Sequence, residues 1–334
     1  MSKKIVVRFI AIISICLLVT AMYFWFLTHQ KSHITSQTIH IPNGAPSTAI
    51  AHLLEDKHII PSAFTFAWLS RLSGQAAQLK PGLYHFEGKL NMQDVLVILT
   101  KGDVLQFKVT IPEGLRTDEM LNLLSSRTKT PLSDWHTALN NIVGDGEFEG
   151  LFLPETYLYS KPIKPQQMLQ QMFDMRKKVE DKLAQELGWN ATQIKRNRII
   201  ASIVEKETAL PKERIWVSAA IHNRLKKNMR LQMDPTVIYG LYLTQGAFNG
   251  NIRRKDLRAD TPWNTYTRGG LPPTPICNPG AESLRAAAYP ADVDYLYFVA
   301  DGTGGHAFAS TLAEHNANVR KWIRIERKMN RHKN

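Results

Sequence analysis

The stretch Ile200–Pro211, "IASIVEKETALP", sets two glutamates, Glu205 and Glu207, in an otherwise apolar run. The apolar residues before them recur at the i, i+3, i+4 spacing of a helix face, so this stretch is predicted to be helical. Glu207 lies four residues beyond Ile203 and seven beyond Ile200, so it projects from the apolar stripe. Glu205 lies more than about 90° away on the same wheel and is expected at the surface.

A carboxyl group against apolar surface loses hydration, which disfavours its charged form and raises its pKa. Such a glutamic acid can donate a proton at neutral pH, as a general acid must. The ordinary alternative is a buried glutamate that pairs with an arginine or caps a backbone group. Both interpretations of Glu207 remain open on the pattern alone.

Two polar segments downstream could surround such a carboxyl group. "MRLQMDPTVIYG" places polar side chains around a proline turn, and "TPWNTYTRGGLPPTPICNPG" combines prolines, glycines, amides and hydroxyls in a long loop. Rigid loops of this composition suit sugar binding, although a structural Ω-loop is the alternative. The candidate substrate-binding residues are Gln232, Asp234, Thr236, Asn264, Thr265, Tyr266, Asn278 and, from "LPETY", Glu155.

The N-terminal region predicts a membrane anchor. Phe9 to Leu27 contains no charged residue, and a bilayer core of ~30 Å needs about 20 apolar residues in a helix. A cleaved signal peptide has a shorter apolar region and a small-x-small cleavage site, whereas this run ends in the bulky "MYFWFL". Positive charges precede it at Lys3, Lys4 and Arg8, which predicts a cytoplasmic N-terminus with the bulk of the chain periplasmic or extracytoplasmic.

Composition narrows the remaining classes. The 334 residues carry a formal charge of +13, part of it in a basic C-terminal run, which is typical of a solvated helix end or of a surface for anionic lipid or polymer. No nucleic-acid recognition motif accompanies the charge, so nucleic acid is not expected as a partner. The two cysteines, Cys16 and Cys277, are not expected to pair. We predict no metal site and no cofactor, because no ligand spacing is present.

The chain is predicted to be an α+β protein with several parts. Short alternating runs and helical runs from 37 to 114 indicate a small α+β module whose β-α-α-β content is compatible with a LysM-like unit. The expected boundaries are 1–8 for a cytoplasmic N-terminus, 9–29 for the transmembrane anchor, 37–114 for the LysM-like module, 115–196 for a helical connector and 197–334 for an α+β catalytic domain with a loop-rich cleft. A short polar tether is expected from about His33 to Ser36.

Several segments together resemble a known family. "ASIVEKET", "NRLKKNMRLQMDPTVIYG", "NTYTRGGLPPTPICNPG" and "SLRAAAYPADVDYLYFVADGTGGHAF", with "HN" at His315 and upstream "LKPGLYHF", "IPEG" and "FEGLFLPETYLY", are similar to the endolytic murein transglycosylases, the MltG-like (YceG-like) proteins. The resemblance implies cleavage between N-acetylmuramic acid and N-acetylglucosamine within nascent peptidoglycan strands, leaving 1,6-anhydromuramic ends. The catalytic glutamate that it implies is the second of E-K-E, here Glu207.

The resemblance also implies a setting: a single-pass protein of the inner membrane, held by residues 9–29, with peptidoglycan strands as substrate and penicillin-binding synthases as partners. The sequence departs from the pattern at Met233, Thr274 and Cys277, which puts details of the cleft lining in doubt. Two alternatives remain: a non-catalytic membrane-anchored glycan-binding scaffold, and a two-carboxylate muramidase-type hydrolase in which Asp234 or Glu155 assists Glu207.

Overall fold

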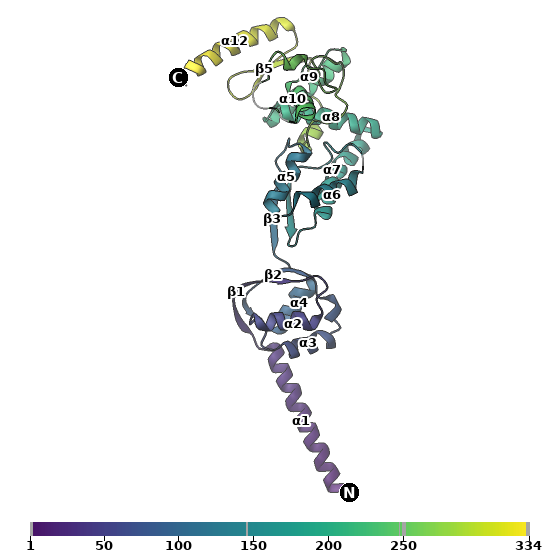
Figure 1. The fold of residues 1–334 in the computed structure, drawn as a ribbon, viewed down its shortest axis with the longest axis vertical. Helices are drawn as coiled ribbons and strands as arrows, with labels where there is room; N and C mark the ends of the chain where they lie inside the picture. Colours follow the sequence, from purple (N-terminus) through teal and green to yellow (C-terminus); the bar gives the residue numbers. More distant parts are fainter. Residues whose placement is uncertain (1–2, 145, 247, 249–251, 332–334) are drawn as a thin grey trace. The chain divides into compact units, whose positions relative to one another are not determined.

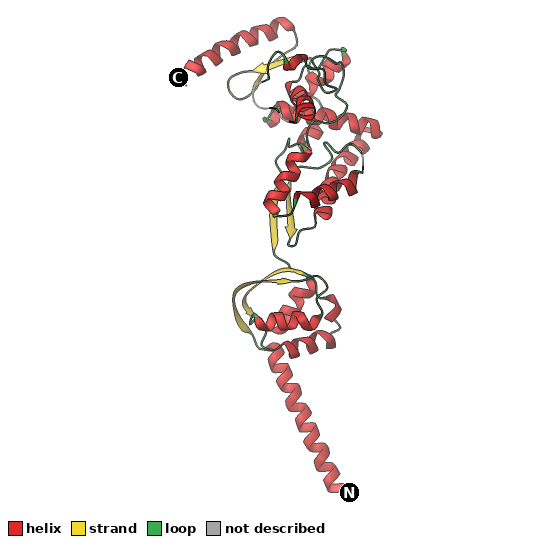
Figure 2. Cartoon of the chain, viewed as in Figure 1, coloured by secondary structure: helices red, strands yellow, loops and turns green. Residues whose placement is uncertain are grey.

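The computed structural model describes residues 3–144, 146–246, 248 and 252–331. These residues form a mixed α+β protein with helices in the majority (Figure 2) and three two-stranded sheets. The chain divides into two compact units, one of Met1–Lys108 with Leu158–Ile163 and the other of Val109–Tyr157 with Lys164–Asn334. The chain therefore passes between the units inside two strands, β3 (Gln106–Thr110) and β4 (Thr156–Ser160), and once more after β4, between Ile163 and Lys164.

The first element is a long apolar helix, α1 (Lys3–His29). Its segment Val7–His29 has a mean hydropathy of 2.4 and is long enough to cross a membrane. A signal sequence would pass the same test, and so would the core helix of a soluble protein. None of the apolar 18-residue window within this segment is buried in the structure, which argues against a core helix. The predicted apolar helix is confirmed and is compatible with a single-pass anchor.

The rest of the first unit follows the order β-α-α-β and then adds a helix. Strands β1 and β2 pair antiparallel, with a bulge between Ile34 and Gln37 on β1. Three helices bury their apolar faces against this pair, around Phe66, Tyr84 and Phe86. The elements are β1 (Ser32–Ile41), α2 (Ser47–Asp56), α3 (Ala63–Leu72), β2 (Gly82–Leu90) and α4 (Met92–Lys101).

Residues adjacent in the sequence determine where helix α4 begins and ends. The Asn91 side chain accepts a hydrogen bond from the backbone N–H of Asp94, and the Asp94 side chain accepts one from the backbone N–H of Asn91, which together form a capping box. Gly102 ends the helix with φ +75°, where only glycine is unstrained. The predicted tether is wrong, because β1 begins at Ser32 and residues 33–36 lie within it.

The second unit is built mainly from helices packed around α8 (Ala191–Glu207). Helix α8 contacts α9, α10 and α11, and its apolar residues form a core with Ile221, Leu231 and Leu284. The surrounding helices are α5 (Thr117–Thr128), α6 (Leu132–Val143), α7 (Pro165–Leu187), α9 (Arg214–Lys226), α10 (Asp234–Gln245) and α11 (Ala281–Ala288). Figure 1 shows α8, α9 and α10 together in the green part of this unit.

A buried ion cluster joins α7 to α8. Glu180 is 3% exposed and accepts a short hydrogen bond from Arg176 on its own helix. Arg198 of α8 donates to both of its oxygens, from Nε at 2.6 Å and from Nη2 at 2.7 Å. Arg176 also donates to the carbonyl oxygen of Leu151 at 3.2 Å. One carboxylate thus fixes two helices and the segment that precedes β4.

The unit closes with a hairpin and a helix. Strands β5 (Tyr297–Ala300) and β6 (His306–Ala309) pair antiparallel across a glycine turn, and α12 (Leu312–Arg331) packs on them. The "LQMDPT" segment was predicted to be a proline turn in a loop. It is instead the beginning of α10, because Pro235 occupies the first helical turn, where a missing N–H costs nothing.

Candidate active site

Glu207 is the last residue of α8. The preceding stretch from Ile199 to Val204 is fully buried, so the helix face that carries Glu207 points into the unit. The residue as a whole keeps some exposed surface, but its Oε1 atom is buried and has no hydrogen-bond partner among the described residues. Such an atom is costly to bury unpaired, so Glu207 is a candidate for contact with a ligand.

Glu205 has a different position from the one predicted. Its side chain is only 5% exposed, so the prediction of a surface residue is wrong. One carboxylate oxygen accepts a hydrogen bond from the backbone N–H of Gly280 at 2.9 Å, and the other lies 3.7 Å from Nη2 of Arg214. Gly280 precedes the first residue of α11, so Glu205 caps that helix from a distant segment. The wheel separated the two glutamates correctly but not their burial, because α11 covers the second face.

The environment of Glu207 keeps its carboxyl group protonated. Burial raises its pKa to about 8, and the nearby negative charge of Asp234 adds to the rise. The Arg224 guanidinium acts in the opposite sense and does not outweigh them. At neutral pH the group is therefore mostly a neutral acid that can donate a proton.

Three side chains from separate elements interact electrostatically with the Glu207 carboxyl group. Asp234 is the first residue of α10 and accepts a hydrogen bond of 2.6 Å from the hydroxyl of Tyr266. Tyr266 comes from the long loop, and burial together with Asp234 and Glu207 raises the pKa of its hydroxyl, which stays protonated. Arg224 comes from α9 and is 7% exposed. The site thus combines helix ends from α8, α9 and α10 with one loop tyrosine.

Arg224 is not among the site residues predicted from the sequence. Its side chain donates to the carbonyl oxygens of Leu296 at 2.6 Å and Leu231 at 2.5 Å, and its guanidinium lies 5.3 Å from the centre of the Tyr297 ring. Burial lowers its pKa. Its only sequence signal is a single arginine inside the helical run "AAIHNRL", which does not distinguish a buried arginine from a surface one.

Replacing Asp234 by asparagine tests whether its charge tunes Glu207. Since the Asp234 charge raises the pKa of Glu207, Asp234→Asn is expected to lower that pKa and move the alkaline limb of the rate–pH profile to lower pH. The amide still accepts the Tyr266 hydrogen bond. The measurement is kcat/KM against pH, with Asp260→Asn, an exposed carboxylate paired with Arg268, as the matched control. An unmoved alkaline limb would contradict this role.

The other predicted contact residues lie in two groups. Gln232 is exposed and adopts φ +50°, an uncommon conformation for a non-glycine residue. The hydroxyls of Thr236 and Thr265, both at most 2% exposed, lie 2.9 Å apart, and the Thr265 oxygen accepts from the N–H of Met233. These two threonines tie the beginning of α10 to the loop that carries Tyr266.

The two predicted asparagines are also buried and fully engaged. The Asn264 amide donates to the carbonyl oxygens of Leu257 and Ala259, and its oxygen accepts from the N–H of Tyr266 at 2.8 Å. The Asn278 oxygen accepts from Phe152 N–H at 3.0 Å, and its amide donates toward α5. These two side chains do not face solvent, and their hydrogen bonds order the loops.

Glu155 lies apart from these groups in every contact that the structure gives. It is exposed, and its carboxylate accepts a hydrogen bond from the adjacent Thr156 N–H. Of the departures from the resemblance, Met233 and Cys277 are buried in the core, and the Thr274 hydroxyl accepts from the Trp263 indole at 2.9 Å. These three residues pack and brace the loops.

A second carboxylate holds the backbone just after Glu207. Glu213 is 3% exposed and accepts hydrogen bonds from the hydroxyl of Thr208 at 3.0 Å and from both the N–H and Nδ1 of His306, at 2.9 and 2.8 Å. Burial alone would raise its pKa, but these hydrogen bonds outweigh burial and lower it. A Cβ on Gly305 would lie 2.6 Å from the Glu213 carboxylate, so the glycine turn is needed for this approach.

Glu213→Ala is expected to lower kcat about tenfold or more, because a small displacement of an acid from its proton acceptor is costly. The variant leaves three donors unpaired, so a stability loss of about 1–3 kcal/mol is also expected. The measurement is kcat per folded molecule, with unfolding followed in parallel. Glu282→Ala, an exposed carboxylate on α11, is the control. Unchanged kcat in folded Glu213→Ala would show that Thr208 needs no such support.

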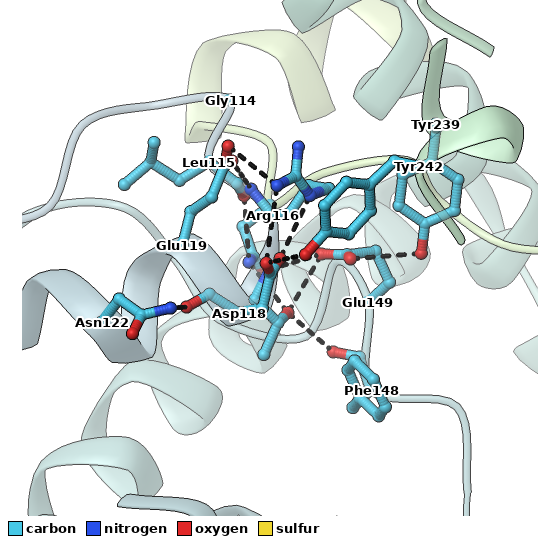
Figure 3. A network of polar contacts seen from close by, with 12 residues as sticks. Gly114, Leu115, Arg116, Asp118, Glu119, Asn122, Phe148, Glu149, Tyr239 and Tyr242 are labelled. Atoms are coloured by element: carbon cyan, nitrogen blue, oxygen red, sulfur yellow. Dashed lines mark hydrogen bonds and ion pairs between the residues drawn. The ribbon is translucent and has the colours of Figure 1, made fainter. Parts of the chain in front are cut away.

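Figure 3 shows how α10 is fixed at its other turns. Glu149 accepts hydrogen bonds from the N–H and hydroxyl of Thr117, at 2.9 and 3.0 Å, and from the hydroxyl of Tyr239 at 3.2 Å. Beside it, Asp118 accepts from the hydroxyl of Tyr242 at 2.5 Å, and the Arg116 guanidinium lies 3.6 Å from the centre of the Tyr242 ring. Two tyrosines of α10 thereby attach it to α5, which sets where Asp234 lies.

The site therefore combines a neutral buried acid, a carboxylate whose charge raises the pKa of that acid, and a tyrosine hydroxyl that donates to this carboxylate, which is an arrangement suited to proton transfer. Within the part of the chain that the structure describes, no group of three or more His, Cys, Asp or Glu side chains could hold a metal ion. The chain belongs to the YceG-like family, whose model matches residues 39–321.

Individual relatives agree with this assignment. An endolytic murein transglycosylase from Bacillus subtilis (strain 168) is 30% identical over 317 residues, which cover 88% of this chain and 87% of the relative. One from Streptococcus pneumoniae serotype 2 is 25% identical, and the match covers 86% of this chain but 58% of that longer protein. The crystal structure of a putative yceG-like protein from Listeria monocytogenes is similar with a TM-score of 0.56 at 30% identity, covering 85% of this chain and 99% of that one.

Proposed function

We propose that this protein is an endolytic murein transglycosylase that cleaves the bond between N-acetylmuramic acid and N-acetylglucosamine inside peptidoglycan strands. The names of its relatives supply the reaction class. The observation that carries the assignment of the site is Glu207, whose buried, unpaired carboxyl oxygen and raised pKa of about 8 suit a general acid.

In the proposed reaction Glu207 acts twice. Its carboxylic acid donates a proton to the glycosidic oxygen as the bond from that oxygen to C1 of the muramic residue breaks. The carboxylate so formed takes the proton of the C6 hydroxyl while that oxygen bonds to C1. The acid is regenerated, the product is the 1,6-anhydro sugar, and no water is consumed. One carboxyl group is sufficient because the nucleophile belongs to the substrate.

The neighbours have supporting roles in this proposal. Asp234 keeps the pKa of Glu207 high and orients the hydroxyl of Tyr266, while Gln232 is free to contact the sugar. Arg224 is the nearby cation that favours the carboxylate formed after the first proton transfer. Thr236, Asn264, Thr265 and Asn278 hold the loops that bear these groups, in a predicted loop-rich cleft.

Hydrolysis is the second candidate, because Asp234 is close enough to Glu207 for its charge to raise the pKa of that group. Two-carboxylate glycosidases use the second group as base or nucleophile and consume water. Mass spectrometry of products from purified nascent glycan, cleaved in ¹⁸O-labelled water, separates the two. Transglycosylation gives unlabelled anhydro ends, whereas labelled reducing ends would overturn the proposal.

The first unit supplies the setting of the reaction. We propose that α1 is a single-pass anchor in the inner membrane with its N-terminus in the cytoplasm, consistent with Lys3, Lys4 and Arg8 preceding the span. The β1-α2-α3-β2 part is proposed as a LysM-like glycan-binding module that holds the strand for the second unit. A non-catalytic scaffold would bind glycan equally well but would leave it uncut, which the same product assay detects.

A further inference from the structure

Helix α3 has an outer face that a water-exposed helix would not have. Its inward residues, from Ala63 to Ser70, are buried in the core of the first unit. The residues that it exposes are Phe64, Trp68, Leu72 and Arg71, so three of four are large and apolar. The three are 74%, 44% and 72% exposed, and they follow one another at the i, i+4, i+8 spacing of a single stripe. Scattered apolar residues are ordinary, but a contiguous stripe marks an interaction surface.

Helix α3, which carries the stripe, is adjacent to the membrane helix. Helix α1 contacts α3 and α4 (Figure 1), and its C-terminal end is fixed to the module. Leu27 packs against the core of the first unit, Thr28 is 2% exposed, and the His29 ring lies 3.4 Å from the Gln93 side chain of α4. The unit therefore begins at the end of the membrane span with no free helix between them.

The link from α1 to the module is also short. Only residues 30 and 31 separate the end of α1 from the beginning of β1, which allows a reach of about 10 Å at full extension. The span Val7–His29 has 23 residues and a length of about 35 Å, slightly more than the hydrocarbon core of ~30 Å. His29 then lies at the outer interface, and α3, in contact with α1, lies there too.

We propose that the Phe64–Trp68–Leu72 stripe of α3 inserts into the interfacial region of the bilayer beside α1. This inference rests on the proposed anchoring by α1. Trp and Phe are residues favoured at the headgroup level, and an amphipathic helix with its apolar face inward binds there in the plane of the membrane. In this arrangement lipid contacts both the exposed apolar residues of α1 and the stripe of the neighbouring helix α3. The membrane contact fixes the first unit against the bilayer and gives the glycan-binding module one defined height.

The test uses the full chain in nanodiscs of phosphatidylethanolamine and phosphatidylglycerol. An environment-sensitive fluorophore is attached at Leu72→Cys in a Cys16→Ser background, since Cys277 is buried. Quenching by lipids spin-labelled near the headgroup, with a blue-shifted emission, is the expected result. The matched control is His40→Cys, an exposed position on β1 eight residues beyond Ser32, roughly 26 Å along the strand. It is expected to show neither effect.

The native Cys16 separates failure of this inference from failure of the anchor. A label at Cys16 of the natural chain that is quenched by spin labels deep in the bilayer shows that α1 is inserted. If Cys16 is quenched and Leu72→Cys responds like His40→Cys, the stripe does not touch lipid and the inference is overturned. Energy transfer between differently labelled Leu72→Cys copies, without lipid quenching, would assign the stripe to a second copy and also overturn it. An unquenched Cys16 label would overturn the anchor and the inference together.

Discussion

Replacing Glu207 by glutamine is expected to reduce glycan cleavage on the order of 10³-fold, since one side chain both gives and takes the proton. The fold is expected to remain intact at neutral pH. The pKa of about 8 means that the natural residue is already neutral there, so the amide replaces it without a change of charge. The measurement is the release of anhydromuramic ends from purified nascent glycan, together with strand binding.

The matched control is Glu205→Gln, two residues earlier on the same helix. Its amide can still accept from the N–H of Gly280, and cleavage is expected to stay within about tenfold of the natural rate, since Glu205 does not face the acid site. Cleavage retained by Glu207→Gln would refute the assignment of the acid. Cleavage lost equally in both variants would point to a general disturbance of α8.

Comparing the natural chain with Glu207→Gln also tests stability, and the expected sign of its pH dependence follows from the pKa of Glu207. In the unfolded chain Glu207 ionises near the ordinary glutamate pKa of 4.5, whereas in the folded chain its pKa is raised to about 8. Between these pH values the folded state holds a proton that unfolding releases, so the free energy of unfolding falls as pH rises through this window. The Glu207→Gln variant has no carboxyl group at this position, so its free energy of unfolding does not fall for this reason. It should match the natural chain at pH 5 and exceed it at pH 9 by on the order of a few kcal/mol.

Removing the carboxylate of Glu180 is expected to destabilise the second unit by about 3–5 kcal/mol. The Glu180→Ala variant leaves the guanidinium groups of Arg176 and Arg198 facing each other without their shared counter-charge, and Glu180 is only 3% exposed. Thermal unfolding of this unit should begin on the order of 10 °C lower. Denaturant unfolding followed by far-UV circular dichroism measures the free energy directly.

The neighbouring pair supplies the control. Lys177 and Asp181 form an ion pair on the same helix at 2.6 Å, but both side chains are 56% exposed. Asp181→Ala should cost no more than about 0.5 kcal/mol, because water screens exposed pairs. Equal losses in the two variants would mean that the buried cluster contributes no more than a surface pair.

The parts of the structure that could be predicted from the sequence are those that depend on local interactions. A few adjacent residues are sufficient to define each of three features: the capping box at Asn91, the end of α4 at Gly102 and the apolar run of α1. The direction of Glu207 followed from the period of one helix. Met168 and Met172, four residues apart on α7, are buried and follow the same helical period.

What could not be predicted depends on contacts across long separations. The burial of Glu205 comes from α11, more than seventy residues later. The place of Arg224 depends on carbonyl groups of Leu231 and Leu296. The polar residues of the loops looked like sugar contacts, but their burial depends on how the loops fold over α10. Composition indicates what side chains can bind, and only the fold decides whether they face ligand or protein.

The division of the chain has a practical consequence for producing soluble fragments. Because the boundary between the units falls within both β3 and β4, residues Leu158–Ile163 belong to the first unit although they lie inside the sequence of the second. A fragment starting at residue 109 would keep β4 (Thr156–Ser160) and lose the first half of β3, its partner strand. An unpaired strand edge invites association with other chains. Fragments that start at residue 32 retain both strands, so the second unit is best produced with the first attached.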